Sequence, residues 1–295
     1  MSASGQGALA GMGALVTGGS GGIGSACARW LLRDGASVTI LGRTEERLVK
    51  AVENLAADAQ FGAKLQYVVG DGARADDVRN AVERASNLAS QFDICVATLG
   101  GGTIIPLLMF EPEQFASELN RNIVSAFLAI KYSVPAMVKG GGGSIVCISS
   151  DAAKMAWQYM AAYCASKSGL EGLVRSAADE LGHLNVRVNA VRPGLTQTES
   201  ANSQRLFANK QLIKSFVEQK PLGRTGVPDD IAAGVRYLAG PESSWVTGQS
   251  FAIEGGNELR RAPSLESIAR ARYGDAAVDA AWSGQIPLPS PEATR

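Results

Sequence analysis

Tyr163 and Lys167, a tyrosine and a lysine four positions apart, are the residues of this chain best suited to move a proton. Residues four apart lie on one face of a helix, so the phenol and the ammonium group can be neighbours. A free tyrosine has a pKa of about 10, but a nearby cation stabilises the phenolate and lowers that pKa. The spacing predicts a proton-transfer pair. An interfacial tyrosine beside a solvated lysine has the same spacing, so the prediction depends on the surrounding motifs.

A glycine-rich turn near the N-terminus supplies the second motif. Residues 14–17 predict a buried strand, which runs into the glycine-rich stretch 18–24 and then into an apolar helix over 26–32. This order brings backbone N–H groups and the positive end of a helix dipole to one point, where a pyrophosphate fits. Three glycines allow the tight turn, the approach of the phosphates and the packing of helix on strand. They are Gly18, Gly22 and Gly24.

Together these motifs resemble the classical type of the short-chain dehydrogenase/reductase (SDR) family, with the 3-oxoacyl reductases as the nearest pattern. The resemblance spans residues 10–256, which is most of the chain. Further positions agree with family motifs in chain order, namely Asp71, Asn122, Ser150 and the segments 193–198, 221–224, 246–249 and 254–256.

The resemblance, and the alternation of apolar strands with helices, predict an α/β fold: a Rossmann-type doubly wound sheet of about seven parallel strands with helices on both faces. We expect a single dinucleotide-binding and catalytic domain over residues 1–256. Strands are expected near 13–17, 37–42, 65–70, 92–98, 143–149, 186–192 and 250–254, and long helices over 112–139 and 152–182. Ligands of such sheets bind at the carboxyl ends of the strands, so one cleft is predicted there.

The resemblance implies roles for four catalytic residues. Tyr163 is expected to act as general acid/base, while Lys167 holds the nicotinamide ribose and lowers the tyrosine pKa. Ser150 donates a hydrogen bond to the substrate oxygen as negative charge develops there. Asn122 helps to position a proton-relaying water, although a polar residue at a helix bend is the alternative. Relatives that reduce enoyl groups place the tyrosine seven residues before the lysine, a position that Met160 occupies here.

The end of the second strand bears on the choice of cofactor. NAD-dependent relatives carry an acidic residue there, whereas this chain has a glycine followed by Arg43, a planar cation for a 2′-phosphate. Ser20 and Thr44 can add hydroxyl contacts. Two glutamates directly after Thr44, and Gly21 where many NADP users carry a basic group, argue against this. NADP is therefore expected, with NAD as the open alternative.

The resemblance also assigns the remaining cofactor contacts, with the adenine amino group expected at Asp71. The full set is Gly18, Ser20, Gly22, Ile23, Gly24, Arg43, Thr44, Asp71, Gly72, Thr98, Gly100, Tyr163, Lys167, Pro193, Gly194, Leu195 and Thr198. One departure stands out: where the family has Asn-Asn-Ala-Gly, residues 97–100 read Ala-Thr-Leu-Gly. The loss of an asparagine that would tie neighbouring strands and the cofactor predicts less hydrogen bonding near the adenosine ribose, with cofactor binding either weaker or re-routed through backbone groups.

The substrate is predicted only as a class. Candidate pocket residues are apolar, and they are Leu107, Met155, Trp157, Met160 and Phe207. They favour a ketone or secondary alcohol on an apolar body, such as a 3-oxoacyl thioester, a steroid or a cyclic ketone. A second function class is a sensor that binds NADP without turnover. The altered segment 97–100 favours a sensor, whereas the intact Ser150, Tyr163 and Lys167 favour an enzyme.

The composition of the chain limits the classes of partner that we expect. The 295 residues are 46% hydrophobic with a formal net charge of +0, so no basic field favours nucleic acid. No signal peptide or membrane span is expected. Four cysteines without metal-ligand spacing predict buried thiols in the cytoplasm and no metal site; they are Cys27, Cys95, Cys147 and Cys164. His183 is expected to cap a helix end.

Residues 257–295 extend beyond the family pattern. A helix start is expected near Pro263, with an apolar stripe that comprises Leu265, Ile268, Ala269 and Ala271. Tyr273 and Trp282 are costly to leave in water, although the proline-rich end over 287–291 favours a solvated tail. Since family members commonly form dimers and tetramers, we expect the extension to pack on the core or on a neighbouring subunit, near a substrate cleft.

Overall fold

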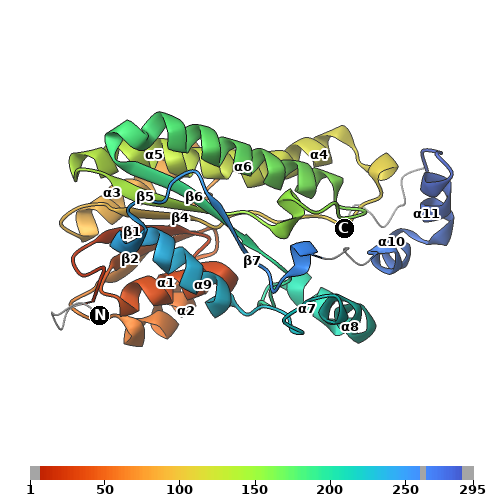
Figure 1. Cartoon of the computed structure of the whole chain (residues 1–295), viewed down its shortest axis with the longest axis horizontal. Helices are drawn as coiled ribbons and strands as arrows, with labels where there is room; N and C mark the ends of the chain where they lie inside the picture. The colour runs from red at the N-terminus through yellow and green to blue at the C-terminus, as the bar shows by residue number, and fades with distance from the viewer. Residues whose placement is uncertain (1–6, 260–263, 288–295) are drawn as a thin grey trace.

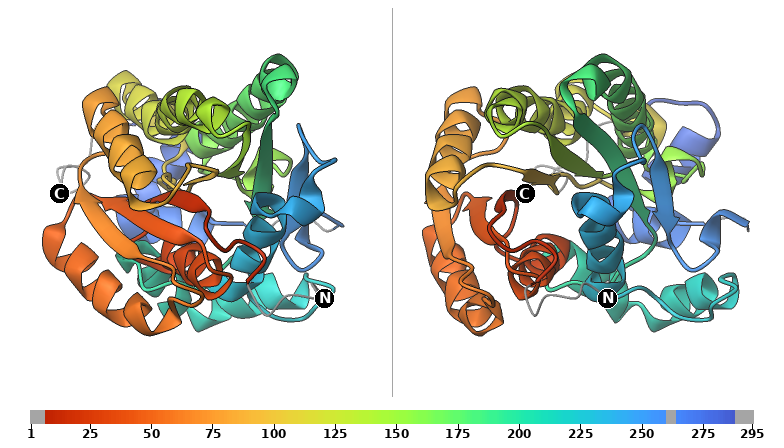
Figure 2. Two further views of the ribbon diagram at one scale, coloured as in Figure 1. Left: turned by 90° about the vertical axis from the view of Figure 1, so that its left-hand side faces the viewer. Right: turned by 60° about the vertical axis from the view of Figure 1, so that its left-hand side comes forward.

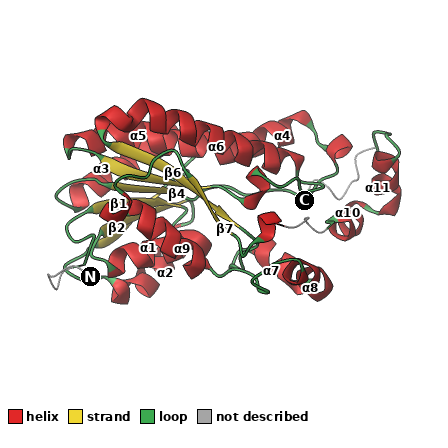
Figure 3. Ribbon diagram, in the orientation of Figure 1, coloured by secondary structure: helices red, strands yellow, loops and turns green. Residues whose placement is uncertain are grey.

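Seven strands form one sheet in the computed structural model, which describes residues 7–259 and 264–287. The strands are β1 (Gly13–Thr17), β2 (Ser37–Gly42), β3 (Leu65–Val69), β4 (Ile94–Ala97), β5 (Gly143–Ile148), β6 (Val186–Pro193) and β7 (Ser250–Ile253). All neighbouring pairs are parallel, in the order β3-β2-β1-β4-β5-β6-β7 (Figure 1; Figure 3). The predicted Rossmann-type sheet is confirmed.

Alternate residues of the strands face two separate helical layers (Figure 2). In β1, Val16 packs with α1 (Gly22–Arg33), α2 (Glu45–Leu55) and α9 (Pro228–Ala239). Its neighbour Leu15 faces the other way, among the apolar side chains of α3, α5 and α6. Those three helices span Ala75–Leu88, Ser125–Lys139 and Ala161–Leu181. Because both faces of the sheet are covered, its strands are nearly continuous apolar runs.

The two long helices differ from expectation. The first is α4 (Pro112–Leu119) joined to α5 through a π-helical turn, Asn120–Val124. The second was expected from residue 152, but α6 begins only at Ala161. Before it, Tyr159 has a left-handed φ of 66°, and its carbonyl accepts a hydrogen bond from the N–H of Ile105 at 2.7 Å. A left-handed residue cannot continue a right-handed helix, which explains the late start.

Four shorter helices lie beyond the carboxyl ends of the strands (Figure 1). They are α7 (Ala201–Ala208), α8 (Lys210–Glu218), α10 (Glu266–Tyr273) and α11 (Asp275–Trp282). Leu212 and Phe216 of α8 form a small core with Leu265, next to α10. A second small core joins Ala269, Tyr273 and Val278 to Ile105. The C-terminal extension therefore packs on its own chain.

The predicted apolar stripe is correct in part. Leu265 and Ala269 are buried and Ile268 is partly buried, but Ala271 is exposed because it points away from that face. Tyr273 is buried, and its hydroxyl donates to the carbonyl of Ile104 at 3.2 Å. Trp282 remains 59% exposed although its Nε1–H donates to the Tyr159 hydroxyl at 2.8 Å. Pro263 and residues 288–295 lie outside the described residues.

A buried ionic network ties the last strand to the centre of the sheet. Arg192 of β6 forms an ion pair with Glu258 at 2.7 Å and approaches Glu171 of α6 at 3.6 Å. Glu171 also accepts hydrogen bonds from Ser149 at 3.0 Å and from Ser250 at 2.7 Å. The network connects the ends of β5, β6 and β7, where the candidate site lies.

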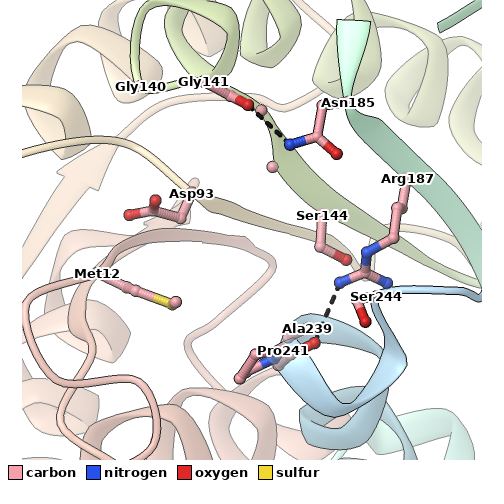
Figure 4. Close-up of a pocket in the computed structure, with 13 residues that line it drawn as sticks. Met12, Asp93, Gly140, Gly141, Ser144, Asn185, Arg187, Ala239, Pro241 and Ser244 are labelled. Atoms are coloured by element: carbon pink, nitrogen blue, oxygen red, sulfur yellow. Dashed lines mark hydrogen bonds between the residues drawn. The ribbon is translucent and has the colours of Figure 1, made fainter. Parts of the chain in front are cut away.

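A pocket of about 260 Å³ lies at the opposite, amino edge of the sheet (Figure 4). Its polar groups are already engaged: Asp93 accepts from the N–H of Gly13 at 2.9 Å, and Arg187 donates to the carbonyl of Leu238 at 2.9 Å. Among the described residues, no helix has the length and apolar character needed to cross a bilayer. Nor do three or more metal-ligating side chains of these described residues lie together so that they could hold a metal ion.

Candidate active site

Tyr163 and Lys167 both lie in the first part of α6, as their spacing predicts. Lys167 is 2% exposed, and its ammonium donates to the carbonyl of Ile148, the last residue of β5, at 2.8 Å. Its Nζ lies 5.7 Å from the centre of the Tyr163 ring. The lysine is thus held between the phenol and the end of the central strand.

Burial dominates the proton equilibria of this pair. It raises the pKa of Tyr163 to about 12, although the Ser150 side chain opposes the rise. It lowers the pKa of Lys167 to about 8. In the chain by itself, desolvation of the phenolate dominates the Tyr163 pKa, and the acidifying effect of Lys167 stays a prediction for the site with its cofactor. At neutral pH Tyr163 carries its proton.

Ser150 lies two residues beyond the end of β5 and is almost fully buried. Its hydroxyl donates to Asp151 Oδ1 at 3.1 Å and accepts from the N–H of Ala152 at 3.2 Å. The neighbouring Ser149 is bonded to Glu171 instead, so only Ser150 shares the Tyr163 environment. Burial raises the pKa of Asp151 to about 6, against the hydrogen bonds from Asn257 and Ser150. In this structure the Ser150 proton is directed at the Asp151 carboxyl group.

Asn122 lies fully buried in the π-helical turn. Its Nδ2 donates to the carbonyls of Gly101 at 3.0 Å and Glu118 at 2.8 Å, and its Oδ1 accepts from the N–H of Gly101 at 3.0 Å. A Cβ on Gly100 would lie 2.5 Å from that Oδ1 and 2.8 Å from Lys167 Nζ. Asn122 clamps the glycine loop beside the lysine; its role in a water relay stays a prediction.

The glycine turn between β1 and α1 has the shape that a pyrophosphate requires. Gly18 and Gly22 have φ of 68° and 54°, and a Cβ on Gly24 would lie 2.3 Å from the carbonyl oxygen of Gly18. The Thr198 side chain lies 3.4 Å from the point that a Cβ on Gly22 would occupy. The positive end of α1 is thus open to close approach by phosphate groups, which fits a dinucleotide.

Thr98 replaces the family asparagine without losing the link between strands. Its N–H donates to Thr17 Oγ1 at 3.1 Å, and its hydroxyl donates to the carbonyl of Thr17. β4 is thereby tied to β1 at their carboxyl ends. A threonine pair thus takes over the connection between the strands, while the expected loss of hydrogen bonding near the adenosine ribose stays a prediction.

The end of β2 carries two arginines rather than one. Arg43 is exposed, and none of the described residues forms a hydrogen bond or ion pair with its guanidinium. Arg47, one helical turn further on, has its Nη2 3.4 Å from the point that a Cβ on Gly21 would occupy. Sequence reasoning missed Arg47, which lies in the first turn of α2. Ser20 is adjacent: its Oγ is 3.4 Å from a Cβ position on Gly42.

The other predicted cofactor residues are placed at the same edge of the sheet. The Asp71 carboxylate accepts from the N–H of Ala73 at 2.9 Å. A Cβ on Gly72 would lie 2.1 Å from Leu99 Cδ1, so a larger residue there requires the Leu99 side chain to move. Gly194 packs against Glu254 in the same way, at 2.7 Å. Ile23, Thr44 and Pro193 lie at the start of α1, the start of α2 and the end of β6.

The apolar candidates divide into two groups. Trp157 stacks on Phe216 with ring centres 5.3 Å apart, and Met160 and Leu195 pack in the same cluster. Leu107, in contrast, is 64% exposed and lines no core. Met155 and Phe207 are partly buried outside these clusters.

Polar residues that sequence reasoning missed lie around Asp151, the residue after Ser150. Asn257 donates to Asp151 Oδ2 at 2.8 Å, and the charge of Lys220 acts on the same carboxyl group. Asp151 could have been found because it follows Ser150 directly. Lys220 and Asn257 have no such signal, since only the folded chain brings them to β5.

Comparisons with known proteins agree with this fold and site. A family model described as enoyl-(acyl carrier protein) reductase matches residues 18–258. Dehydrogenase/reductase SDR family member 4 of Rattus norvegicus is 34% identical over 256 residues, covering 86% of this chain and 90% of that protein. A short-chain type dehydrogenase/reductase from Mycobacterium ulcerans has a TM-score of 0.87 and 33% identity, covering 92% of this chain and 98% of that one.

A 7α-hydroxysteroid dehydrogenase, solved with NADH and 7-oxo glycochenodeoxycholic acid, has a TM-score of 0.79 and 29% identity, covering 86% of this chain and 96% of that one. The chain therefore belongs to the short-chain dehydrogenase/reductase family. It is an oxidoreductase that acts on CH–OH or carbonyl groups with NAD(P).

Proposed function

We propose that the protein is an NADP(H)-dependent oxidoreductase that interconverts a ketone and a secondary alcohol on a largely apolar substrate. The observation that carries this proposal is the meeting of three groups at the carboxyl edge of the sheet. The protonated Tyr163 hydroxyl interacts with Ser150, and the buried Lys167 ammonium lies 5.7 Å from the Tyr163 ring. Such a group of donors suits a carbonyl oxygen that gains negative charge.

The residues divide the proton chemistry between them. When bound, the nicotinamide supplies or accepts the hydride. Tyr163 gives its proton to the substrate oxygen during reduction and takes it back during oxidation. Ser150 turns its hydroxyl toward the same oxygen and steadies the developing charge. Lys167 stabilises the tyrosinate left behind, and the bond to the Ile148 carbonyl keeps its ammonium in place.

Support for NADP comes from the two arginines at the end of β2. Arg43 has no carboxylate partner among the described residues, and Arg47 reaches the glycine turn. Guanidinium groups suit a phosphate through paired N–H donors. Arg47 supplies the basic group that the sequence appeared to lack at Gly21. We therefore place the 2′-phosphate between these side chains.

Arg43→Asp is expected to weaken NADPH binding by about tenfold or more, because a charge-assisted hydrogen bond worth roughly 1.5–3 kcal/mol is lost. The new carboxylate should accept the 2′-hydroxyl of NADH and shift preference toward that cofactor. Fluorescence titration with both cofactors measures the change, and Arg175→Asp on the exposed side of α6 is the control. Equal NADPH affinity in wild type and Arg43→Asp contradicts the assignment.

The substrate class rests on the small core at the carboxyl edge. Trp157 and Leu195 are partly buried and pack with the buried Phe216 in this core, which gives it an apolar outer surface. A steroid, a 3-oxoacyl chain or a cyclic ketone fits such a surface. Met160 at the start of α6 lacks the hydroxyl that the enoyl-reducing pattern requires, which favours carbonyl chemistry. The sensor alternative loses its main support, because Thr98 restores the tie between β1 and β4.

The decisive experiment is a screen of ketones and alcohols with NADPH, NADH and their oxidised forms. Turnover is measured through the change in nicotinamide absorbance. We expect turnover with at least one cyclic or steroidal ketone, faster with NADPH. Tight binding of NADPH with no turnover of any such compound favours the sensor instead.

We also propose that the protein is a cytoplasmic homodimer or homotetramer. The edge strand β7 and the neighbouring helix α9 leave Phe251 and Tyr237 partly exposed, and Trp245 is 99% exposed nearby. Aromatic groups on an open sheet edge suit burial against a second copy of the chain. The buried free thiols Cys27, Cys95 and Cys147 suit a reducing compartment.

The C-terminal extension is proposed to complete the substrate site. A chain that ends after Leu259 loses the apolar cover of Phe216 and Ile105. We expect a raised KM for apolar ketones and little change in cofactor affinity, measured by steady-state kinetics. A chain that ends after Pro287 is the control, since it keeps α10 and α11. An unchanged KM in the shorter chain would show that the extension plays no part in substrate binding.

A further inference from the structure

Lys220 is a buried cation without a direct partner. It follows α8, is 4% exposed, and its ammonium makes no hydrogen bond or ion pair with any described residue. The carboxylates of Asp151 and Glu254 act on it only through their charge. An ammonium group has three donors, and those of Lys220 are not used by any described residue. This side chain is therefore available to an acceptor that is not part of the chain.

Asn257 supplies a matching unused acceptor. It is fully buried, and its Nδ2 donates to Asp151 Oδ2 at 2.8 Å and to Met155 Sδ at 3.5 Å. Its Oδ1 is buried with no hydrogen-bond partner. A carboxylate accepts only, so the amide cannot be turned to exchange its oxygen and nitrogen.

The backbone around Asn257 is held firmly. Glu258 forms the buried ion pair with Arg192, and Glu254 accepts from the N–H groups of Gly256 at 3.1 Å and Glu258 at 2.9 Å. The unpaired oxygen of Asn257 is thus presented by a rigid support. Such support is typical of a binding group rather than of a loosely placed surface amide.

Asp151 connects this polar pair to the reaction centre. One of its oxygens accepts from Ser150 at 3.1 Å, and the other accepts from Asn257 at 2.8 Å. The pair therefore lies one carboxylate away from the substrate carbonyl, several bonds along a bound molecule. Two carboxylates, of Asp151 and Glu254, outnumber the single charge of Lys220, which disfavours an anionic ligand. A neutral hydroxyl both accepts and donates, and it complements the two groups.

We propose that Lys220 and Asn257 form a polar subsite that binds a hydroxyl group of the substrate, several bonds from the carbonyl that Tyr163 serves. The hydroxyl oxygen accepts from the Lys220 ammonium, and its proton points to Asn257 Oδ1. This inference rests on the proposed function and narrows it: the preferred substrate is a hydroxylated ketone on an apolar frame. A site built to bond a hydroxyl discriminates strongly against an analogue that lacks it.

The test compares cyclohexanone with 3- and 4-hydroxycyclohexanone, using NADPH. In wild type we expect kcat/KM for the better hydroxyketone to exceed that for cyclohexanone by about tenfold or more. Lys220→Met keeps the apolar stem but removes the donors, so this ratio should fall close to one. Lys210→Met, on the exposed start of α8, should keep the wild-type ratio. Equal ratios in wild type and Lys220→Met overturn the subsite.

A binding measurement separates this inference from the proposed function. Saturation-transfer NMR with cyclohexane-1,4-diol and cyclohexanol reports binding without turnover. Preference for the diol in wild type that is lost in Lys220→Met supports the subsite, even if no ketone is reduced. In that case the proposed function fails while the subsite stands. No preference for the diol in wild type overturns the subsite whatever the kinetics show. The wild-type comparison of the diol with cyclohexanol can still overturn the subsite if Lys220→Met does not fold.

Discussion

Tyr163→Phe should lose turnover while the cofactor still binds. The change removes one hydroxyl and keeps the ring, which packs against the loop: a Cβ on Gly102 would lie 2.7 Å from Tyr163 Cγ. Removal of a general acid lowers kcat by a factor of about 10²–10⁴. Steady-state assays with a ketone that the wild type reduces measure the loss, and fluorescence titration measures NADPH affinity.

Tyr132→Phe provides the matched control for this prediction. Tyr132 lies on α5, where its hydroxyl accepts from Arg79 at 3.4 Å, away from the carboxyl edge of the sheet. The same loss of one hydroxyl should leave kcat near the wild-type value. Substantial activity in folded Tyr163→Phe would refute the assignment of Tyr163 as the proton donor.

Lys167→Met should damage both turnover and cofactor binding, because the ammonium serves the tyrosine and, by the family pattern, the nicotinamide ribose. Burial lowers the pKa of Lys167 to about 8, so the wild type should lose cofactor affinity as pH rises through that value. The variant should show weak binding without this pH dependence. Titration with NADPH between pH 7 and pH 9 measures the affinity of the wild type and of the variant. If the affinities of both proteins change with pH in parallel, Lys167 does not have this role in cofactor binding.

The free energy of unfolding should respond to pH in the opposite sense to the cofactor affinity. The pKa of Lys167 falls from 10.5 to about 8 on folding, so the unfolded chain binds the extra proton between these values. The free energy of unfolding contributed by Lys167 therefore rises as pH increases from about 8 to 10.5. Lys167→Met carries no buried charge and should be more resistant to denaturant than the wild type at pH 7. Denaturant titration of the wild type and Lys167→Met, at pH 7 and at pH 10.5, measures this difference.

Most of the fold could be predicted because apolar strands and glycine turns are local signals. Every expected strand is present, and Gly18, Ser150 and Tyr163 meet at one edge as the parallel order requires. The late start of α6 could not be predicted, because the left-handed turn at Tyr159 is held by a hydrogen bond from Ile105, far away in the chain.

The chemistry of the site was harder to predict from the sequence than its position. The spacing of Tyr163 and Lys167 indicates a pair, but the direction of the tyrosine pKa depends on how deeply the fold buries the phenol. The polar side of the substrate site was missed for a related reason. Lys220 and Asn257 stand in unremarkable sequence and acquire a role only through Asp151, which three separate segments surround.

The ion pair between Arg192 and Glu258 also bears on how the protein is made. A ribosome delivers Ser150, Tyr163 and Lys167 well before Glu258, and multistrand α/β chains begin to fold from the N-terminal end during synthesis. A nascent chain that has reached only β6 carries the reactive residues but lacks Glu258, β7 and the amide that binds Asp151. Products of premature termination in this region thus hold Arg192 with Glu171 but without the closer Glu258, which destabilises them and marks them for proteolysis before they can capture a cofactor.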